Sequence, residues 1–343
     1  MDRPAGRLAR CEPTAVPRRA VVSSPARRRW LGALVAGSLL PWLAACGEPD
    51  APQNVGTIVF PGYELLFLAR ETGLLASDQA RLVELLSSTD NLRLMEEGRL
   101  DAATLTVDEV LGLRSRGVDL RIVAVLDISD GADAVMARAG ISTLQALKGA
   151  RVGVEDSAMG AVMFDALLSA AGLHLEDVTK VPITADQAVS AFQSELVDVV
   201  VTFEPWVAQL EGLGAVRLFD STRIPDRVVD VLAVKADVIE RRGAAVRHLV
   251  AAHFSALGRF QADAASASRV MAARLQVEPH EVPAAFKGLR LPDAAANRQV
   301  LRTGGRFDTA VQAVQAMMQT RRMLTQVVPL QGLVDTRFLP EAP

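Results

Sequence analysis

The chain has 343 residues, which is long for one ordinary domain and comfortable for two. Its 37 basic and 40 acidic side chains are nearly balanced and aromatic residues make up only 4% of the chain, which argues against a polybasic or base-stacking nucleic-acid binder. Two cysteines exclude a disulfide scaffold, and without a CxxC motif or a Cys/His cluster the sequence predicts no metal site.

The N-terminal segment has the pattern of an export signal. Residues 1–29 contain eight arginines, and an apolar run from Trp30 to Ala45 follows that is too short for a permanent membrane span. The run ends in Leu43-Ala44-Ala45-Cys46-Gly47, which resembles the lipobox of bacterial lipoproteins. We therefore expect a signal peptide over residues 1–45 that is cleaved before Cys46, whose thiol then carries a diacylglycerol.

The exported part is expected to be acidic and anchored only by this lipid. Subtracting the eight basic and two acidic residues of the signal leaves 29 against 38, a net charge of about −9. Residues 46–54 hold two prolines and polar side chains and predict a flexible tether. No later segment approaches 18 uninterrupted apolar residues. Arg27-Arg28-Arg29-Trp30-Leu31 also resembles a twin-arginine motif, so Sec and twin-arginine export both stay open.

From Val55 onward, short β-prone runs alternate with helical runs. Strands are expected at residues 56–60, 82–86, 101–105, 120–126, 150–154, 178–183, 197–201 and 216–219. After about Val229 the pattern is mostly helical, with helices expected at 244–262, 264–275, 283–287 and 309–324. The alternation predicts parallel sheets covered by helices on both faces, and there are too many units for one compact sheet. We therefore expect an α/β fold with two lobes.

An ordered set of short motifs resembles a known family. The motifs include Pro61-Gly62-Tyr63-Glu64, Ser87-Ser88-Thr89-Asp90, Gly131-Ala132-Asp133-Ala134, Val152-Gly153-Val154-Glu155 and Thr202-Phe203-Glu204-Pro205-Trp206. From Thr57 to Phe338 the chain resembles the periplasmic substrate-binding proteins of the nitrate, sulfonate, taurine and thiamine-pyrimidine group (NMT1-like, SsuA/TauA-like), which serve ABC transporters.

The resemblance implies a type II periplasmic binding protein fold, with two α/β lobes joined by two crossovers and a helical C-terminal part. Lobe 1 would comprise residues 55–135 plus 230–343, and lobe 2 residues 136–229. The ligand would lie between the lobes, which present it to the permease and ATPase subunits of an ABC importer. We expect a monomer without cofactor, held at the periplasmic or outer face of the cell envelope through Cys46.

Candidate ligand contacts follow from the expected strand ends. In open parallel sheets, ligands bind beyond the carboxyl ends of the strands. Twelve residues at or near such positions are selected as ligand-binding candidates: Tyr63, Ser88, Thr89, Thr106, Asp108, Asp130, Asp133, Glu155, Ser157, Glu204, Trp206 and Asp230. The set is rich in carboxylates, which would repel nitrate or bicarbonate. It favours a ligand with a nitrogen that is protonated or donates hydrogen bonds, such as an amine, a zwitterion like taurine, or an aminopyrimidine.

Two of these expectations concern particular contacts. The helix N-termini at Thr89 and Ser157 could hold a sulfonate oxygen through backbone N–H groups. Tyr63 and Trp206 could pack a ring or an alkyl chain.

Simpler roles stay open for several of these residues. Asp108, Ser157 and Glu204 are types that helix N-termini favour, Tyr63 and Trp206 could be core residues, and Asp130 and Asp133 could stabilise a turn.

An enzyme is not expected. The related fungal pyrimidine-forming proteins use a cysteine-rich iron motif and a histidine. The mature chain keeps only Cys46, has no histidine at an expected strand end and contains no Gly-x-Ser-x-Gly motif. A ligand-sensing module for a membrane signalling partner is the other alternative.

Overall fold

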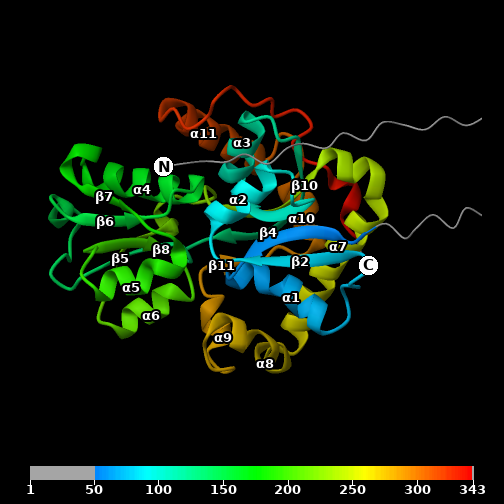
Figure 1. Ribbon diagram of the computed structural model, residues 1–343, viewed down its shortest axis with the longest axis horizontal. Coiled ribbons are helices and arrows are strands. Elements are labelled where there is room, and N and C mark those ends of the chain that lie inside the picture. Colours follow the sequence, from blue (N-terminus) through cyan, green and yellow to red (C-terminus); the bar gives the residue numbers. More distant parts are fainter. Residues whose placement is uncertain (1–50, 342–343) are drawn as a thin grey trace, which may run out of the picture. The chain divides into compact units, whose positions relative to one another are not determined.

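The computed structural model describes residues 51–341 (Figure 1). The predicted signal peptide, Cys46 and the first part of the predicted tether lie outside these residues. The first strand, β1 (Gln53–Ile58), overlaps the last two residues of the predicted tether. Within residues 51–341, no helix combines the length and the hydrophobicity needed to span a membrane.

Lobe 1 is built on a six-stranded mixed sheet with the strand order β11-β4-β10-β3-β1-β2. Its strands are β1, β2 (Ala80–Leu85), β3 (Ala102–Thr106), β4 (Leu120–Ser129), β10 (Val229–Lys235) and β11 (Leu289–Arg290). Strands β1, β2 and β3 are parallel, whereas β10 runs antiparallel between β3 and β4. Figure 1 shows α2 (Ser88–Glu96) and α3 (Val107–Ser115) on one face of the sheet, with α1 (Glu64–Glu71) and α8 (Ala264–Leu275) on the other.

Lobe 2 is built on a five-stranded sheet with the order β7-β6-β8-β5-β9. The strands are β5 (Ala134–Ala137), β6 (Arg151–Val154), β7 (Thr179–Pro182), β8 (Val199–Thr202) and β9 (Val216–Asp220). Figure 1 shows α4 (Ala158–Ala171) on one face and α5 (Ala188–Gln193) and α6 (Trp206–Gly212) on the other. The C-terminal part returns to lobe 1 as α7 (Ala236–Ala262), α8, α9 (Val282–Ala285), α10 (Ala294–Val300) and α11 (Arg306–Thr320).

The prediction of two α/β lobes with a helical C-terminal part is confirmed, but the prediction of parallel sheets is wrong for the strands that flank the crossovers. Strand β5 is antiparallel to both of its neighbours, and β10 is antiparallel to β3 and β4. A chain that leaves one sheet and enters the other directly, without a covering helix, arrives in the opposite direction. These two strands were not among the expected strands, because they do not belong to the strand-helix alternation on which the prediction relied.

The two crossovers lie side by side and are joined by hydrogen bonds. The hydroxyl oxygens of Ser129 and Ser221 are 2.7 Å apart, and the amide of Gly131 donates to Ser221 Oγ over 2.7 Å. A third segment packs against them, because the amide of Asp130 donates to the carbonyl of Gly288 over 2.7 Å. A Cβ at Gly288 would lie 2.7 Å from the Ala132 amide nitrogen, so this close backbone approach requires glycine. The hinge between the lobes is therefore a bundle of three backbone segments.

A buried asparagine completes the edge of β4. Strand β11 pairs only with Ile128 and Ser129 of β4. Further along β4, Asn297 of α10 replaces a strand: its Oδ1 accepts from the Val125 amide over 2.7 Å, and its Nδ2 donates to the Val125 carbonyl over 3.0 Å. Asn297 is fully buried. It thus satisfies both backbone groups of a strand residue just before the strand reaches the cleft.

Replacing this asparagine should destabilise the protein. Asn297→Ala leaves both Val125 backbone groups buried without a partner, and we expect the free energy of unfolding in urea to fall by about 2–3 kcal/mol. The control is Gln299→Ala on the exposed face of the same helix, which should change stability by less than about 0.5 kcal/mol. Equal effects of the two substitutions would contradict the role given to Asn297.

Candidate ligand-binding cleft

A small cavity lies between the lobes, where strands from both sheets end. The cavity has a volume of about 20 Å³, and both lobes contribute to the wall: Ile58, Phe60, Tyr63, Ser88, Thr106, Asp133, Met159, Phe203 and Asp230. Of these, Thr106 ends β3, Ser88 begins α2, and Asp230 lies near the start of β10. This is room for about one water molecule or one ammonium group, far below the roughly 300–1,000 Å³ of ligand pockets, so an organic ligand requires the lobes to separate further than in this closed form.

Aromatic rings close one side of the cavity. The Phe60 ring of lobe 1 meets the Phe203 ring of lobe 2 edge to face, with centroids 5.3 Å apart. Phe60 also packs edge to face on Tyr63, with centroids 5.0 Å apart. Phe203 follows β8 directly, so each lobe sends one phenylalanine from a strand end to the same contact. These rings exclude water from one wall and leave the polar groups on the other.

Carboxyl groups lie close to the Tyr63 hydroxyl. The Tyr63 hydroxyl donates a hydrogen bond to Asp230 Oδ1. Asp230 lies directly across the strand pair from Asp127 of β4. The Asp127 carboxylate in turn packs against Gly62, where a Cβ would lie only 1.9 Å from Asp127 Oδ2. Only glycine lets the segment before Tyr63 approach these acids so closely.

Burial keeps these acids partly protonated near neutral pH. Burial raises the pKa of Asp230 well above its ordinary value, and the neighbouring charges of Asp127 and Asp133 raise it further. Burial likewise raises the pKa of Asp127 to about 8 and that of Asp133 to about 6. The charged form of each is disfavoured because water is excluded, and for Asp127 and Asp230 neighbouring carboxylates of the same sign add to this effect.

Two more acids stand in the first turn of α3. Glu109 Oε2 accepts a hydrogen bond from the Thr106 amide over 3.0 Å, which is one half of a capping box. Burial raises the pKa of Asp108 to about 7 and raises the pKa of Glu109 well above its ordinary value. Neither oxygen of Asp108 has a hydrogen-bond partner, and Glu109 Oε1 has none. Capping therefore uses only one of these four carboxylate oxygens.

Glu155 links the two lobes beside the cavity. It follows β6 of lobe 2, and its Oε1 accepts from both the amide and the hydroxyl of Thr89 in lobe 1, each over 3.2 Å. Its Oε2 is buried and has no hydrogen-bond partner. Burial raises the pKa of this carboxyl. Glu155 thus joins the two lobes by hydrogen bonds and is also a further buried carboxyl group with no basic partner.

The cavity presents hydrogen-bond acceptors in excess. Two buried carboxyl groups, Asp133 and Asp230, line the cavity, and four more lie on the segments beside it: Asp108, Glu109, Asp127 and Glu155. All six are at most 5% exposed. Among the described residues that line the cavity there is no lysine, arginine or histidine. Buried oxygens without a partner also occur on Thr106, Asp133 and Thr202. Buried acceptors cost stability unless a donor satisfies them, so the arrangement favours a ligand that brings N–H donors or positive charge.

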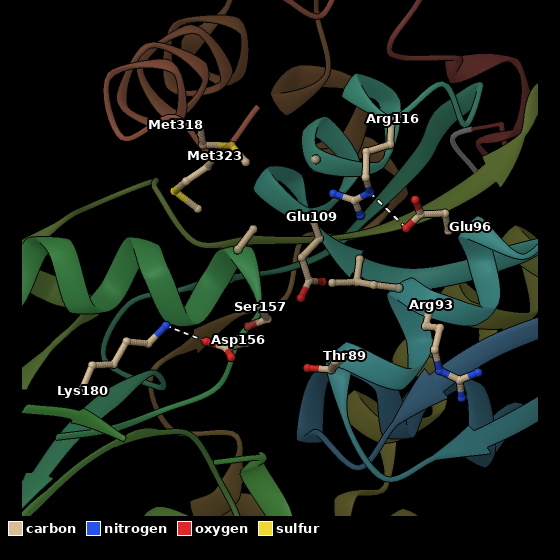
Figure 2. Close-up of a pocket in the computed structure, with 13 residues that line it drawn as sticks. Thr89, Arg93, Glu96, Glu109, Arg116, Asp156, Ser157, Lys180, Met318 and Met323 are labelled. Atoms are coloured by element: carbon tan, nitrogen blue, oxygen red, sulfur yellow. Dashed lines mark hydrogen bonds and ion pairs between the residues drawn. The ribbon is translucent and has the colours of Figure 1, made fainter. Parts of the chain in front are cut away.

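A larger outer pocket of about 450 Å³ also lies between the lobes (Figure 2). Its wall includes Thr89 and Glu109 of lobe 1 and Ser157 of lobe 2. Ser157 caps α4, since its Oγ accepts from the Gly160 amide over 3.1 Å. The basic side chains in this wall have acidic partners: Arg116 pairs with Glu96 at 3.0 Å and Lys180 with Asp156 at 2.6 Å. They do not compensate the buried acids.

The structure brings most of the predicted contact residues together. Tyr63, Ser88, Thr106, Asp133 and Asp230 line the inner cavity, and Thr89 and Ser157 line the outer pocket. Asp108 and Glu155 are among the six buried acids around the cavity. The groups come from six different segments of the chain.

Three predicted contacts lie elsewhere. Asp130 is about half exposed and pairs with Arg290 at 3.7 Å. Glu204 accepts from the Ala208 amide over 3.1 Å and so caps α6, and with Asp130 it lines a different pocket beyond the hinge. Trp206 is partly buried and packs against the core of lobe 2. Glu204 and Trp206 thus have the simpler roles, capping a helix and packing in the core.

The stretches at the expected strand ends include Asp127, Met159 and Phe203, but the twelve candidates leave out the apolar wall and two of the acids, Asp127 and Glu109. Ile58, Phe60, Met159 and Phe203 read as core residues in the sequence. The sequence does contain a signal for Asp127, because it is the one charged residue in the otherwise apolar run from Ile122 to Ile128. A charged residue inside a buried strand needs a partner or a function, and that rule would have marked it.

The buried acids should make stability depend on pH. They hold protons in the folded protein that they lose when exposed by unfolding, so the folded state binds more protons and stability falls as pH rises through their folded pKa values. Between pH 6.5 and 8.5, Asp127 and Asp108 alone predict a fall in the free energy of unfolding of about 2–3 kcal/mol. His253 acts in the opposite direction: burial lowers its pKa to about 4, so it is neutral in the folded state, and loss of its proton in the unfolded state offsets about 0.4 kcal/mol of this fall.

Urea denaturation at both pH values measures this fall. Asp127→Asn should flatten the dependence, and Glu96→Gln, which removes a half-exposed acid, should leave it unchanged. A stability that stays constant or rises across this range would contradict the assignment.

Comparison with known proteins agrees with this architecture. The model of the NMT1-like family matches residues 47–276, more than half of the chain. A protein of Brucella abortus (strain 2308) described as a binding protein is 26% identical over 135 residues. The match covers 38% of this chain and 42% of that protein, so it spans less than half of the relative's length.

Solved structures share the fold at low sequence identity. The alkanesulfonate-binding protein SsuA from Xanthomonas axonopodis pv. citri, bound to MOPS, has a TM-score of 0.69 at 19% identity over 83% of this chain and 98% of that chain. The desulfurization enzyme DSZB has a TM-score of 0.61 at 20% identity over 84% of this chain and 97% of its own. One fold thus serves both binding and catalysis. The chain belongs to the NMT1-like family and has the type II periplasmic binding protein fold.

Proposed function

We propose that this chain is the exported solute-binding component of an ABC importer and holds a small, nitrogen-bearing organic ligand between its lobes. The family, the two-lobed fold and the cavity at the lobe interface support a binding role. The observation that carries the choice of ligand is the set of six buried carboxyl groups, with no basic side chain among the described cavity residues.

A protonated or hydrogen-bond-donating nitrogen suits this wall best. Such a group would donate to Asp133, whose Oδ2 has no other partner, and to Asp230 beside it. The apolar part of the ligand would lie against Phe60, Phe203 and Met159. A simple anion such as nitrate would meet carboxylates instead of donors. Amines, zwitterions such as taurine with the ammonium group inward, and aminopyrimidines all meet these requirements.

Ligand binding should stabilise the protein. In thermal unfolding of the purified full chain, at least one of taurine, an alkylamine or an aminopyrimidine should raise the Tm, because binding to the folded state alone adds about 2.7 kcal/mol at 100 times the Kd. Asp133→Asn removes the inner charge and should weaken this binding at least tenfold. Asp130→Asn, three residues away and outside the cavity, is the matched control and should bind as the unmodified protein does.

Two results would overturn the proposal. A response to nitrate or bicarbonate alone would contradict the ligand class. Chemical change of the bound compound, followed by mass spectrometry after long incubation, would contradict a binding role without turnover.

We also propose that the protein is a lipoprotein, anchored through Cys46 after removal of residues 1–45. The support is the arginine-rich start, the apolar run and the small residues before the cysteine. Cys46→Ser should move the protein from the membrane fraction to the soluble fraction, since the substituted residue cannot receive the lipid thioether. The test is fractionation of cells followed by immunoblotting. Retention of the Cys46→Ser protein in the membrane fraction would mean that another segment holds it there.

A further inference from the structure

The buried acids of the cleft form two groups at different depths. The inner group, Asp127, Asp133 and Asp230, surrounds the Tyr63 hydroxyl and the inner cavity. The outer group has one carboxyl from each lobe: Glu109, which lines the outer pocket, and Glu155, which is hydrogen-bonded to Thr89 of the same pocket. A single cationic nitrogen placed at the inner group leaves the outer group unsatisfied.

Glu109 points into the outer pocket from lobe 1. Figure 2 shows its carboxylate reaching from α3 into the space bordered by Thr89 and Ser157. The side chain is only 3% exposed. Oε2 accepts from the Thr106 amide, and Oε1 is buried with no hydrogen-bond partner. One oxygen therefore fixes the position of the carboxylate, and the other is available to a ligand.

Glu155 has the same division of roles in lobe 2. Oε1 is held by the amide and hydroxyl of Thr89, and Oε2 is buried without a partner, on a side chain that is 5% exposed. Thr89, which holds Glu155, lines the same pocket as Glu109. Burial and the charge of Asp108 raise the pKa of Glu109, and the charge of Glu155 raises it further. Each lobe thus contributes one unpartnered carboxylate oxygen to the same region.

No described side chain of the outer pocket compensates this pair. Arg116 is bound to Glu96, Lys180 to Asp156, and Arg93 to Glu97 at 3.0 Å. Two like charges brought together from opposite lobes oppose closure, since burial strengthens their repulsion. A positive group between them would turn this repulsion into two charge-assisted hydrogen bonds.

The chemistry of the pair favours an organic cation over a metal ion. Among the described residues, no group of three or more His, Cys, Asp or Glu side chains has an arrangement that could hold a metal. An ammonium group needs only a few acceptors at hydrogen-bond distance, and the free oxygens of Glu109 and Glu155 are such acceptors.

We propose that the ligand carries two positively charged nitrogens, one held by Asp133 and Asp230 in the inner cavity and the other held between Glu109 and Glu155. A short aliphatic diamine is the simplest compound of this kind, and its methylene groups would pass the apolar wall formed by Phe60, Met159 and Phe203. This inference rests on the proposed binding function and narrows its ligand class. It assigns Glu109 and Glu155 as the residues that distinguish diamines from monoamines.

Calorimetric titration of the purified full chain at pH 7.5 tests the inference. The probes are 1,3-diaminopropane, 1,4-diaminobutane and 1,5-diaminopentane, each compared with the monoamine of equal carbon number. At least one diamine should bind ten or more times tighter than its monoamine. Glu109→Gln and Glu155→Gln should each weaken diamine binding at least tenfold and change monoamine binding less than threefold.

The variants are chosen to preserve the fold. Glutamine keeps a carbonyl oxygen for the Thr106 amide at position 109 and for Thr89 at position 155. Asp130→Asn removes a half-exposed acid that lines neither the inner cavity nor the outer pocket, and it should leave both affinities unchanged. Thermal unfolding of each variant checks its fold, and the comparison of diamines with monoamines on the unmodified protein needs no variant.

The possible failures are distinguishable. Equal binding of monoamines and diamines overturns the second nitrogen position and leaves the proposed function intact. Equal weakening of both by Glu109→Gln overturns the role given to Glu109. If no diamine binds and taurine or an aminopyrimidine does, the two-nitrogen ligand is wrong and the binding function stands. If only nitrate or bicarbonate binds, both proposals fall.

Discussion

The burial of acidic side chains between two lobes, without an opposite charge to balance them, is the constraint on which the rest of the structure depends. A carboxylate removed from water must gain a proton, a cation or hydrogen bonds. Here the protein supplies only part of this: the Tyr63 hydroxyl for Asp230, the Thr106 amide for Glu109, and Thr89 for Glu155. Raised pKa values are the direct result, because protonation is the remaining way to reduce the charge.

The surrounding scaffold holds these groups in place against their repulsion. Asp127 and Asp230 lie on adjacent central strands, so neither can turn away without disturbing the sheet of lobe 1. Asn297 completes the edge of β4 close to Asp127, and Gly62 lets the backbone before Tyr63 approach the same carboxylate. Buried carboxyl groups without a basic partner lower the stability of the protein, and such a loss is typical of functional sites. A satisfied core would have apolar residues at these positions.

The fold was largely predictable from the sequence, and the site only in part. Strands such as 120–126 and 197–201 could be predicted because each is a short apolar run bounded by turns. Strands β5 and β10 could not, since they follow crossovers and their direction is set by the other lobe. Tyr63, Asp133 and Asp230 could be selected because polar groups at strand ends converge in α/β folds. Phe60 and Phe203 could not, because a cavity wall and a core have the same composition until the two lobes are placed together. Glu204 and Trp206 are the opposite case. Their side chains suit a ligand site, but Glu204 caps α6 and Trp206 packs against the core of lobe 2.

The lobe-to-lobe contacts at the cavity also bear on the rate of ligand exchange. In the closed form, the edge-to-face contact of Phe60 with Phe203 and the two hydrogen bonds from Thr89 to Glu155 bridge the lobes directly. A bound molecule can leave only after both contacts have separated, because the two rings and the Thr89–Glu155 hydrogen bonds border the cavity. The residence time of a ligand therefore depends on how fast these two contacts separate, in addition to the contacts that the ligand makes itself. Variation at position 89 would thus change the speed of delivery while the buried carboxyl groups stay the same.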